Sequence, residues 1–494
     1  MNDPSQQQTQ TNTINKILTI FALSLLAITV LPRLVSIDMF SDGIWYASAA
    51  RNMAEGVGDF WHPHYMEGIE ENVFHHPPLG IWSQSLAFRI FGDSTQVEFF
   101  WGVIAGLAIV LLMGVLWKRL LYLKPDLPGT WWPVTLFVLT PITSWVMANN
   151  LLENTMTVFV MLGALAAYQA VRESSKARIL AWAVMSGLML SMAFLTKGVP
   201  GIFPLALPFL AGYFLEEVPL RRGLIVTASI LGIILFFLGL MVIVAGQEAV
   251  GFFHAHFVQK LASSFSEAGE LSGPRYYLIK KLILELMVPL SVGLVATVIH
   301  RLRSSKRFLS LLQQDGLAML FLFVGLSGSL PLLIIPVQMG WYIFPSLPFF
   351  IIAISLLFRR QASEFESFLS LHIWARRLVS ALAVVFISVS LVCVVFFQGK
   401  SVVRNKDFYN DLVFRPIPIP PRSQVTVYPK SVLDDWSLAA NMQRLFRISV
   451  TAAPGHAYMI TVGPLDTENF PTYTPVQNFA PARYHVYQMM ARKP

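Results

Sequence analysis

Eleven long apolar stretches constrain the fold of this 494-residue chain more than any other feature. About 20 mostly apolar residues suffice for an α-helix to cross a bilayer. Only 13% of the residues are charged, whereas soluble domains carry roughly 25%. We therefore predict an all-α polytopic membrane protein. The predicted spans are Ile17–Val35, Glu98–Trp117, Trp131–Met147, Thr155–Val171, Ile179–Leu195, Val199–Leu215, Gly223–Val244, Leu282–Ile299, Leu317–Ile335, Trp341–Phe358 and Leu378–Phe397.

Lys and Arg gather in alternate loops between these stretches. Basic clusters follow the second, fourth, sixth, eighth and tenth spans, whereas the short loops 148–154 and 336–340 contain no Lys or Arg. Since short cytoplasmic loops are enriched in these residues, the N-terminus is predicted inside and the C-terminus outside. The formal charge of +8 is explained by this topology signal, so no nucleic acid partner is expected.

The predicted topology divides the chain into three parts. Residues 1–16 form a polar cytoplasmic tract that is predicted to be disordered, and residues 17–397 form the membrane domain, with long outer loops at 36–97 and 245–281. Residues 398–494 are predicted to form a small α/β domain outside the membrane. Its expected elements are strands at Val425–Tyr428, Ile448–Thr451 and Tyr458–Val462 and a helix at Leu433–Phe446. The sole cysteine, Cys393, excludes an intrachain disulfide and a four-thiolate metal site.

Two carboxylates lie at predicted outer ends of spans, where partial desolvation raises the basicity of an acid. Asp42 lies in the first outer loop, before a predicted helix at Trp45–Glu55, and Glu153 lies in the short loop before the fourth span. Asp42 could equally be a solvated acid or a helix cap. Glu153 could equally interact with the dipole of the helix that follows it. The residues alone leave both interpretations open.

Lys197 lies between the fifth and sixth spans, on the predicted outer side, and breaks the charge pattern of the other short outer loops. An anion is therefore expected beside it, and its ammonium suits a phosphate. The alternative is that Lys197 reaches the lipid headgroups. His254 and His256 could bind a metal ion with His75 or His76, but two-residue spacing is not a specific metal signature. Histidines at a membrane interface also serve as hydrogen-bonding or aromatic-belt residues.

Taken in order, these segments resemble the membrane glycosyltransferases of the C superfamily. The resemblance is strongest to the bacterial branch related to protein O-mannosyltransferases and the aminoarabinose transferase of lipid A. It covers residues 37–350, and Gly43 and His75-His76 stand where that branch has an acid and a Glu-Lys pair. The matching segments are Asp42-Gly43-Ile44-Trp45-Tyr46, His76-Pro77-Pro78-Leu79, Glu153, Thr196-Lys197-Gly198 and Tyr342-Ile343-Phe344-Pro345-Ser346-Leu347-Pro348.

The resemblance implies transfer of a hexose or pentose from a polyprenyl-phosphate carrier to a hydroxyl of lipid A, a protein or another envelope glycan, at the outer face and with inversion. Phosphate is already a good leaving group, so the reaction needs a base for the hydroxyl and cations for the phosphate. Asp42 is the implied base, Glu153 orients the acceptor or shares that role, and Lys197 holds the phosphate. The other implied substrate contacts are His75, His76, Tyr46 and Tyr342. No cofactor is required, and a divalent metal on His75 and His256 is the weaker expectation.

A transporter or flippase of a lipid-linked substrate is the main alternative function. Such proteins often contain internal repeats and acids near the membrane midplane, and this sequence shows no half-to-half repeat. A membrane scaffold that uses its outer tail for protein contacts is a third class. It leaves the outer cluster of Asp42, Glu153 and Lys197 unexplained.

Reporter fusions at Gly68 and Pro454 test the predicted orientation. Both positions should report the exterior, because both follow spans that leave the cytoplasm in the pattern of basic loops. An interior signal from either fusion would overturn the orientation and separate the candidate site residues between the two faces of the membrane.

Overall fold

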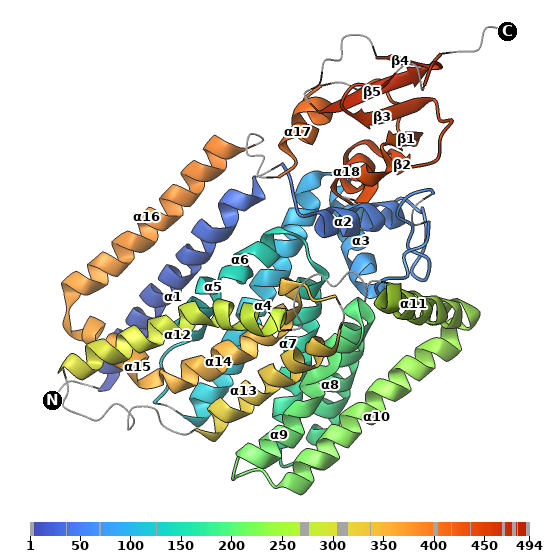
Figure 1. The fold of residues 1–494 in the computed structure, drawn as a ribbon. Coiled ribbons are helices and arrows are strands. Elements are labelled where there is room, and N and C mark those ends of the chain that lie inside the picture. Colours follow the sequence, from blue (N-terminus) through green and yellow to red (C-terminus); the bar gives the residue numbers. More distant parts are fainter. Residues whose placement is uncertain are drawn as a thin grey trace.

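The structure, a computed structural model, describes residues 4–490 except 36, 69–70, 125, 267–275, 304–314, 336, 399–403, 416, 435, 467–469, 477–480 and 482. Long helices lie side by side in one bundle, which carries a small domain with a β-sheet at one end (Figure 1). The main helices of the bundle are α1 (Pro4–Leu34), α4 (Thr95–Leu123), α7 (Leu152–Arg172), α8 (Lys176–Lys197), α10 (Leu220–Ala245), α12 (Tyr277–Arg303), α13 (Gly316–Ser329), α14 (Leu347–Leu357) and α16 (Ile373–Phe397).

The polytopic membrane fold is confirmed, and the structure divides the apolar stretches differently from the eleven predicted spans. Within the described residues, nine helical stretches are long and apolar enough to cross a membrane, and a tenth crossing results if a bent pair of helices is one span. That pair is α5 (Trp131–Leu139) and α6 (Pro141–Ala148), bent by 78°. Its bend coincides with Pro141, because proline has no amide hydrogen to continue the helix.

The predicted span Val199–Leu215 is not a continuous α-helix. It consists of a 3₁₀ helix, η1 (Val199–Ala206), followed by the short helix α9 (Leu207–Phe214). Three prolines, at positions 200, 204 and 208, interrupt the regular pattern of amide donors. A second 3₁₀ segment, η5 (Gly340–Ser346), precedes α14 and carries Pro345.

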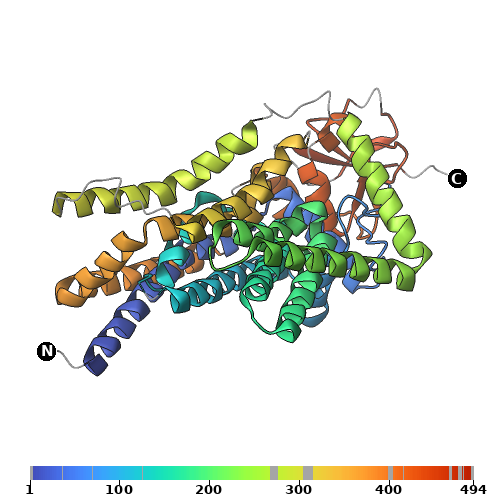
Figure 2. The same ribbon diagram turned by 90° about the horizontal axis from the view of Figure 1, so that it is seen from below.

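Helix α1 extends the N-terminal span into the tract that was predicted to be disordered, since it begins at Pro4. Its first turns lie beside α15 (Arg359–Leu371), at the end of the bundle far from the C-terminal sheet. Figure 2, seen from below, also places the start of α1 and the C-terminal sheet at opposite ends of the molecule. The two ends of the described chain therefore lie at opposite ends of the helical bundle.

Three shorter helices gather at the end of the bundle nearest the sheet (Figure 1). They are α2 (Ser41–Ala54), α3 (Leu79–Phe91) and α11 (Gln247–Ser266). Helix α2 begins four residues before the predicted helix Trp45–Glu55, so Asp42 lies in its first turn. Much of the predicted outer loop 245–281 is helix α11.

The C-terminal part contains a five-stranded mixed sheet in the order β2-β1-β3-β5-β4. The three predicted strands are confirmed as β1 (Gln424–Tyr428), β2 (Ser449–Thr451) and β3 (Tyr458–Val462), whereas β4 (Tyr473–Pro475) and β5 (Tyr484–Met489) were not predicted. Strand β1 pairs in parallel with β2 and β3. The predicted helix Leu433–Phe446 is divided into η7 (Lys430–Asp434), α18 (Trp436–Asn441) and the π-helical turn η8 (Met442–Phe446).

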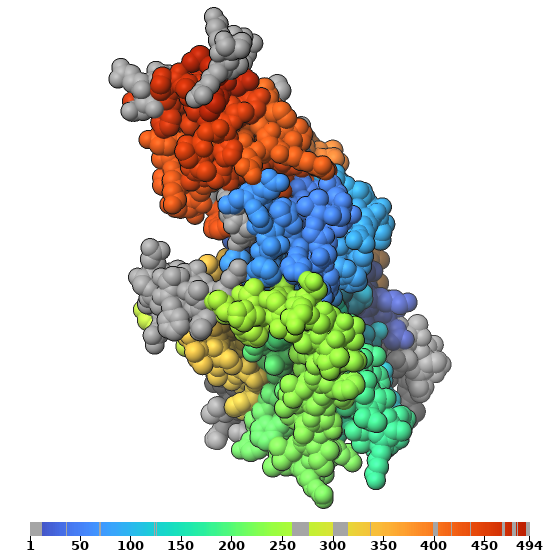
Figure 3. Space-filling model, turned by 90° about the vertical axis from the view of Figure 1, so that its right-hand side faces the viewer, coloured from blue at the N-terminus to red at the C-terminus, as the bar shows by residue number. Residues whose placement is uncertain are grey.

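Buried charges attach this C-terminal domain to the membrane bundle. Arg444 is 4% exposed and donates from Nε and Nη2 to the two carboxylate oxygens of Glu98, at 2.9 and 3.0 Å, and from Nη1 to Asp93 at 2.7 Å. Arg51 of α2, itself buried, donates to the backbone carbonyls of Gln443 and Arg444. Figure 3 shows the domain seated directly on the segment that contains α2.

Replacement of Glu98 by Gln tests this attachment. The change leaves the Arg444 guanidinium buried without its full countercharge, which costs roughly 3–5 kcal/mol when a buried pair is broken. We expect the lower end of that range, because Asp93 still compensates part of the charge. Asp407→Asn is the control, since its pair with Arg483 is about half exposed on both sides and such pairs contribute at most about 1 kcal/mol. Thermal unfolding in detergent should show a clear loss of stability for Glu98→Gln alone. Equal unfolding curves for both variants would contradict the role of the Arg444–Glu98 pair in attaching the C-terminal domain.

Candidate active site

Close backbone packing positions Asp42 at the start of α2. A side chain at Gly43 would collide with the backbone carbonyl of Asn149, so only glycine allows α2 to approach the short 149–151 loop. Two amide side chains complete the contact: Asn149 Oδ1 accepts from the Phe40 amide, and Asn150 Nδ2 donates to the Gly43 carbonyl, both at 2.9 Å. The glycine that departs from the family pattern thus has a packing reason, and the same loop leads directly to Glu153.

Glu153 and Lys197 form a buried ion pair. Glu153 lies in the first turn of α7 and is fully buried, and Lys197 is the last residue of α8 with its side chain 9% exposed. Lys197 Nζ donates to Glu153 Oε1 at 2.6 Å. The anion that the sequence predicted beside Lys197 is therefore present within the chain itself, so a bound phosphate is not required to explain this lysine.

Two tyrosines flank the ammonium of Lys197. Its Nζ lies 6.0 Å from the ring centre of Tyr46 in α2 and 5.4 Å from that of Tyr342 in η5, within the range of cation–π attraction. Within the described part of the chain, Glu153 Oε2 has no hydrogen-bond partner. Five residues that the sequence singled out, from α2, α7, α8 and η5, are thus brought together: Asp42, Tyr46, Glu153, Lys197 and Tyr342.

The surroundings of Asp42 make it a stronger base than an ordinary aspartate. Burial raises the pKa of Asp42 to about 6, with the nearby Lys197 ammonium lowering it and the Glu153 carboxylate raising it. Asp42 lies in the first turn of α2, which fits the alternative of an acid at a helix terminus. No side chain forms a capping hydrogen bond at the start of this helix, where Phe40 is the N-cap residue. Asp42 instead lines a cavity.

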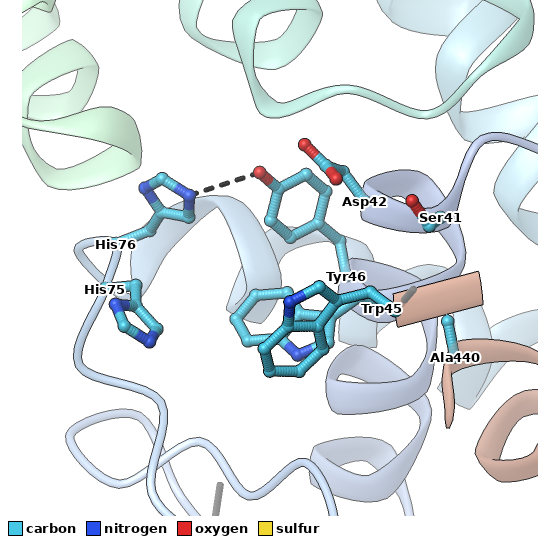
Figure 4. Close-up of a pocket in the computed structure, with 8 residues that line it drawn as sticks. Ser41, Asp42, Trp45, Tyr46, His75, His76 and Ala440 are labelled. Atoms are coloured by element: carbon cyan, nitrogen blue, oxygen red, sulfur yellow. Dashed lines mark hydrogen bonds between the residues drawn. The ribbon is translucent and has the colours of Figure 1, made fainter. Parts of the chain in front are cut away.

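This cavity, of about 580 Å³, opens between the membrane bundle and the C-terminal domain. Figure 4 shows Asp42 and Tyr46 on one wall and His75 and His76 facing them. Tyr46 Oη and His76 Nε2 form a hydrogen bond of 3.2 Å. The lining residues are Ser41, Asp42, Trp45, Tyr46, His75, His76, Trp436 and Ala440.

The sequence did not reveal the contribution of the C-terminal domain to this cavity. Trp436 and Ala440 come from α18, and Trp436 is 45% exposed although it is a large aromatic residue. Neither residue lies in a recognisable motif, so the only signal available in the sequence was a tryptophan at the start of a predicted outer helix.

His75 and His256 were the residues predicted to bind a metal ion. His256 is buried, and its Nδ1 hydrogen-bonds with the Phe74 carbonyl at 2.6 Å, which places it near the His75 segment. Among the residues that the structure describes, no group of three or more His, Cys, Asp or Glu could hold a metal ion. The His256 ring also stacks on that of Phe252.

Comparison with known proteins supports the resemblance drawn from the motifs. Residues 75–245 match the family model described as dolichyl-phosphate-mannose-protein mannosyltransferase, and this range contains His75, His76, Glu153 and Lys197. No curated protein matches the chain.

Solved structures show the same fold. ArnT from Cupriavidus metallidurans bound to undecaprenyl phosphate aligns with a TM-score of 0.59 and 15% identity over 95% of this chain and 97% of ArnT. Its apo form gives a TM-score of 0.59 and 14% identity, over 94% and 96% of the two chains. The apo oligosaccharyltransferase from Archaeoglobus fulgidus gives a TM-score of 0.50 and 12% identity, over 90% of this chain and 64% of that one. The ArnT-like fold includes the C-terminal domain, because the alignment extends over nearly the whole of both chains.

Proposed function

We propose that the protein transfers a hexose or pentose from a polyprenyl-phosphate carrier to an acceptor hydroxyl of a lipid, protein or other envelope glycan, with inversion. The observation that carries this proposal is the placement of Asp42 at a cavity wall, beside the Glu153–Lys197 pair. A base and a cation are the two groups that this reaction needs. The undecaprenyl phosphate named for ArnT adds support for a lipid-linked donor.

The proposed reaction is a single displacement. Asp42 accepts the proton of the acceptor hydroxyl, whose oxygen forms a bond to the anomeric carbon of the sugar. The bond between that carbon and the phosphate oxygen breaks, and both of its electrons leave with the polyprenyl phosphate. Lys197, assisted by His75 or His76, stabilises the charge that develops on the phosphate, while Glu153 keeps the ammonium in place and faces the acceptor.

We further propose that the site faces the periplasmic side of a bacterial inner membrane. The start of α1 and the C-terminal domain lie at opposite ends of the bundle (Figure 1), which supports the orientation that the basic loops predict. All the titratable residues of the proposed site lie at the end that carries the C-terminal domain. A transporter of the same lipid-linked substrate would leave the donor chemically intact, so donor consumption separates the two functions.

Asp42→Asn should keep the fold and lose most of the transfer activity. Removal of a general base typically costs about 10²–10⁴ in rate. In the wild type, the carboxylate is the active form, so the rate should fall as the pH drops through about 6, where burial places the pKa of Asp42. Consumption of a radiolabelled polyprenyl-phosphate sugar, with envelope extract as acceptor source, measures both effects. Glu71→Gln, an exposed acid of the same outer loop, is the control, and a near-normal rate in Asp42→Asn would assign the base elsewhere.

Lys197→Met combined with Glu153→Gln should weaken binding of undecaprenyl phosphate by about 10-fold or more. A charge-assisted contact to phosphate contributes roughly 1.5–3 kcal/mol, equivalent to about 10–150-fold in affinity. The double variant is preferred because Lys197→Met alone leaves a buried, unpaired carboxylate and can destabilise the fold. Binding to purified protein in detergent, after thermal unfolding has shown that the variant is folded, is the measurement. Wild-type affinity in the double variant would remove Lys197 from the donor site.

A further inference from the structure

An exposed tryptophan, Trp436, reaches the candidate active site from the C-terminal domain. Ten of the twelve tryptophans are buried or partly buried, and the two exposed ones are Trp374, at 59%, and Trp436, at 45%. The ring of Trp374 packs near those of Phe368 and His372, with ring centres 5.9 and 6.2 Å away. Within the residues that the structure describes, the indole of Trp436 makes no hydrogen bond and packs on no other aromatic ring. Trp436 therefore presents an aromatic surface that the fold itself does not use.

This surface lines the same cavity of about 580 Å³ as Asp42 and His75. Ala440, four residues after Trp436 in α18, also lines it, because residues four apart lie on the same face of a helix. Figure 4 shows Ala440 and His75 on opposite sides of the cavity. Since the side chain of Ala440 ends at its β-carbon, helix α18 does not itself fill the space beside the indole.

Hydrogen bonds fix α18, and with it Trp436, relative to the helix that carries Asp42. Tyr409 Oη lies 2.6 Å from the carbonyl oxygen of Ile37, in the segment that leads to α2, and 3.3 Å from Oδ1 of Asn441, the last residue of α18. Arg51 of α2 also donates to backbone carbonyls of η8, which directly follows α18. The indole is therefore held in place before any ligand binds, which lowers the entropy cost of binding.

The lining of this cavity suits an uncharged ring that carries hydroxyl groups. Its described residues comprise three aromatic side chains, two imidazoles, a serine hydroxyl, a carboxylate and an alanine, and they include no Lys or Arg. A phosphate would find no cation on these walls. A sugar ring has hydroxyls at its edge, which Ser41 and His75 can bind, and C–H groups on its faces, which the negative face of an aromatic ring attracts. Small-molecule sites typically combine apolar or aromatic walls with a few polar groups in this way.

The proposed displacement requires the sugar to lie beside Asp42. The acceptor oxygen that loses its proton to Asp42 attacks the anomeric carbon, so this carbon must be close to the same carboxylate. Tyr46 lines the cavity, and its ring centre lies 6.0 Å from Lys197 Nζ. A donor whose phosphate is at Lys197 can therefore extend its sugar past Tyr46 into the cavity, where Trp436 forms part of the wall.

We propose that Trp436 stacks on the ring of the transferred sugar, so that the C-terminal domain takes part in sugar recognition. The proposal rests on the proposed glycosyl transfer and adds a substrate-binding residue to it. An aromatic face contacts C–H groups rather than particular hydroxyls. Trp436 therefore strengthens binding of the sugar ring in general, and hydrogen bonds from the other walls discriminate between sugars.

Lipid binding to the purified full-length protein in detergent tests the proposal. Undecaprenyl-phosphate mannose, glucose and arabinose are each compared with bare undecaprenyl phosphate, so that the ratio of affinities isolates the contribution of the sugar. The wild type should bind at least one sugar-bearing lipid more tightly than the bare lipid. Trp436→Ala should weaken binding of that lipid about 5-fold or more and leave bare undecaprenyl phosphate unchanged. Trp436→Phe should retain more of the sugar's contribution than Trp436→Leu, because leucine keeps apolar area without an aromatic face.

Trp374→Ala is the matched control, because Trp374 is an exposed tryptophan near the start of α16, at the opposite end of the bundle (Figure 1). It should bind every lipid as the wild type does. Since Trp436 is nearly half exposed, its variants should fold, which thermal unfolding verifies.

An unchanged affinity ratio in Trp436→Ala would overturn the proposal. So would an equal loss for bare undecaprenyl phosphate, or a wild type that gains nothing from any of the three sugars. Failure of the proposed function would appear differently, as wild-type protein that binds a sugar-bearing lipid through Trp436 but does not consume it in the presence of envelope extract.

Discussion

The buried ion pair between Glu153 and Lys197 is the interaction on which the arrangement of the site depends. Removing two charges from water costs several kcal/mol for each ion, so neither side chain would be stable alone between apolar helices. The helix termini assist, since an acid at the start of α7 and a base at the end of α8 both interact favourably with the helix dipoles. The pair keeps the ammonium between Tyr46 and Tyr342 and creates the field in which Asp42 titrates.

Helix α2 connects this pair to the C-terminal domain. On one side, Gly43 packs on the loop that leads to Glu153. On the other side, Arg51 holds the backbone of η8, next to the Arg444–Glu98 pair. The cavity wall that carries Asp42 is therefore fixed between the membrane bundle and the domain that supplies Trp436. This construction makes the C-terminal domain a structural part of the candidate site.

Irregular backbone occurs close to Lys197, Tyr342 and Arg33. The 3₁₀ helix η1 begins just after Lys197, and η5 contains Tyr342. The bend between α5 and α6 borders a cavity that Arg33 also lines. Lipid offers no hydrogen bonds to such segments, so their polar groups need partners inside the protein. Glu285 provides one for α6, and a hydrogen bond between Ser329 and Ser346 joins α13 to η5. Broken helices are thus tolerated where polar side chains compensate them.

The sequence by itself determined the membrane class, the position of nearly every apolar helix and the residues that gather around Lys197. These features are local, because hydrophobicity over 20 residues selects a span and each motif lies at the end of one. The structure departs from the predicted spans where prolines make Val199–Phe214 irregular, and strands β4 and β5 were not predicted. Only the tertiary structure decided that Glu153 is the partner of Lys197, 44 residues away, and that Arg444 meets Glu98 across 346 residues. Pairings of this kind, like the two cavities, depend on which helix ends become neighbours in the fold. Local sequence patterns do not predict which helix ends these are.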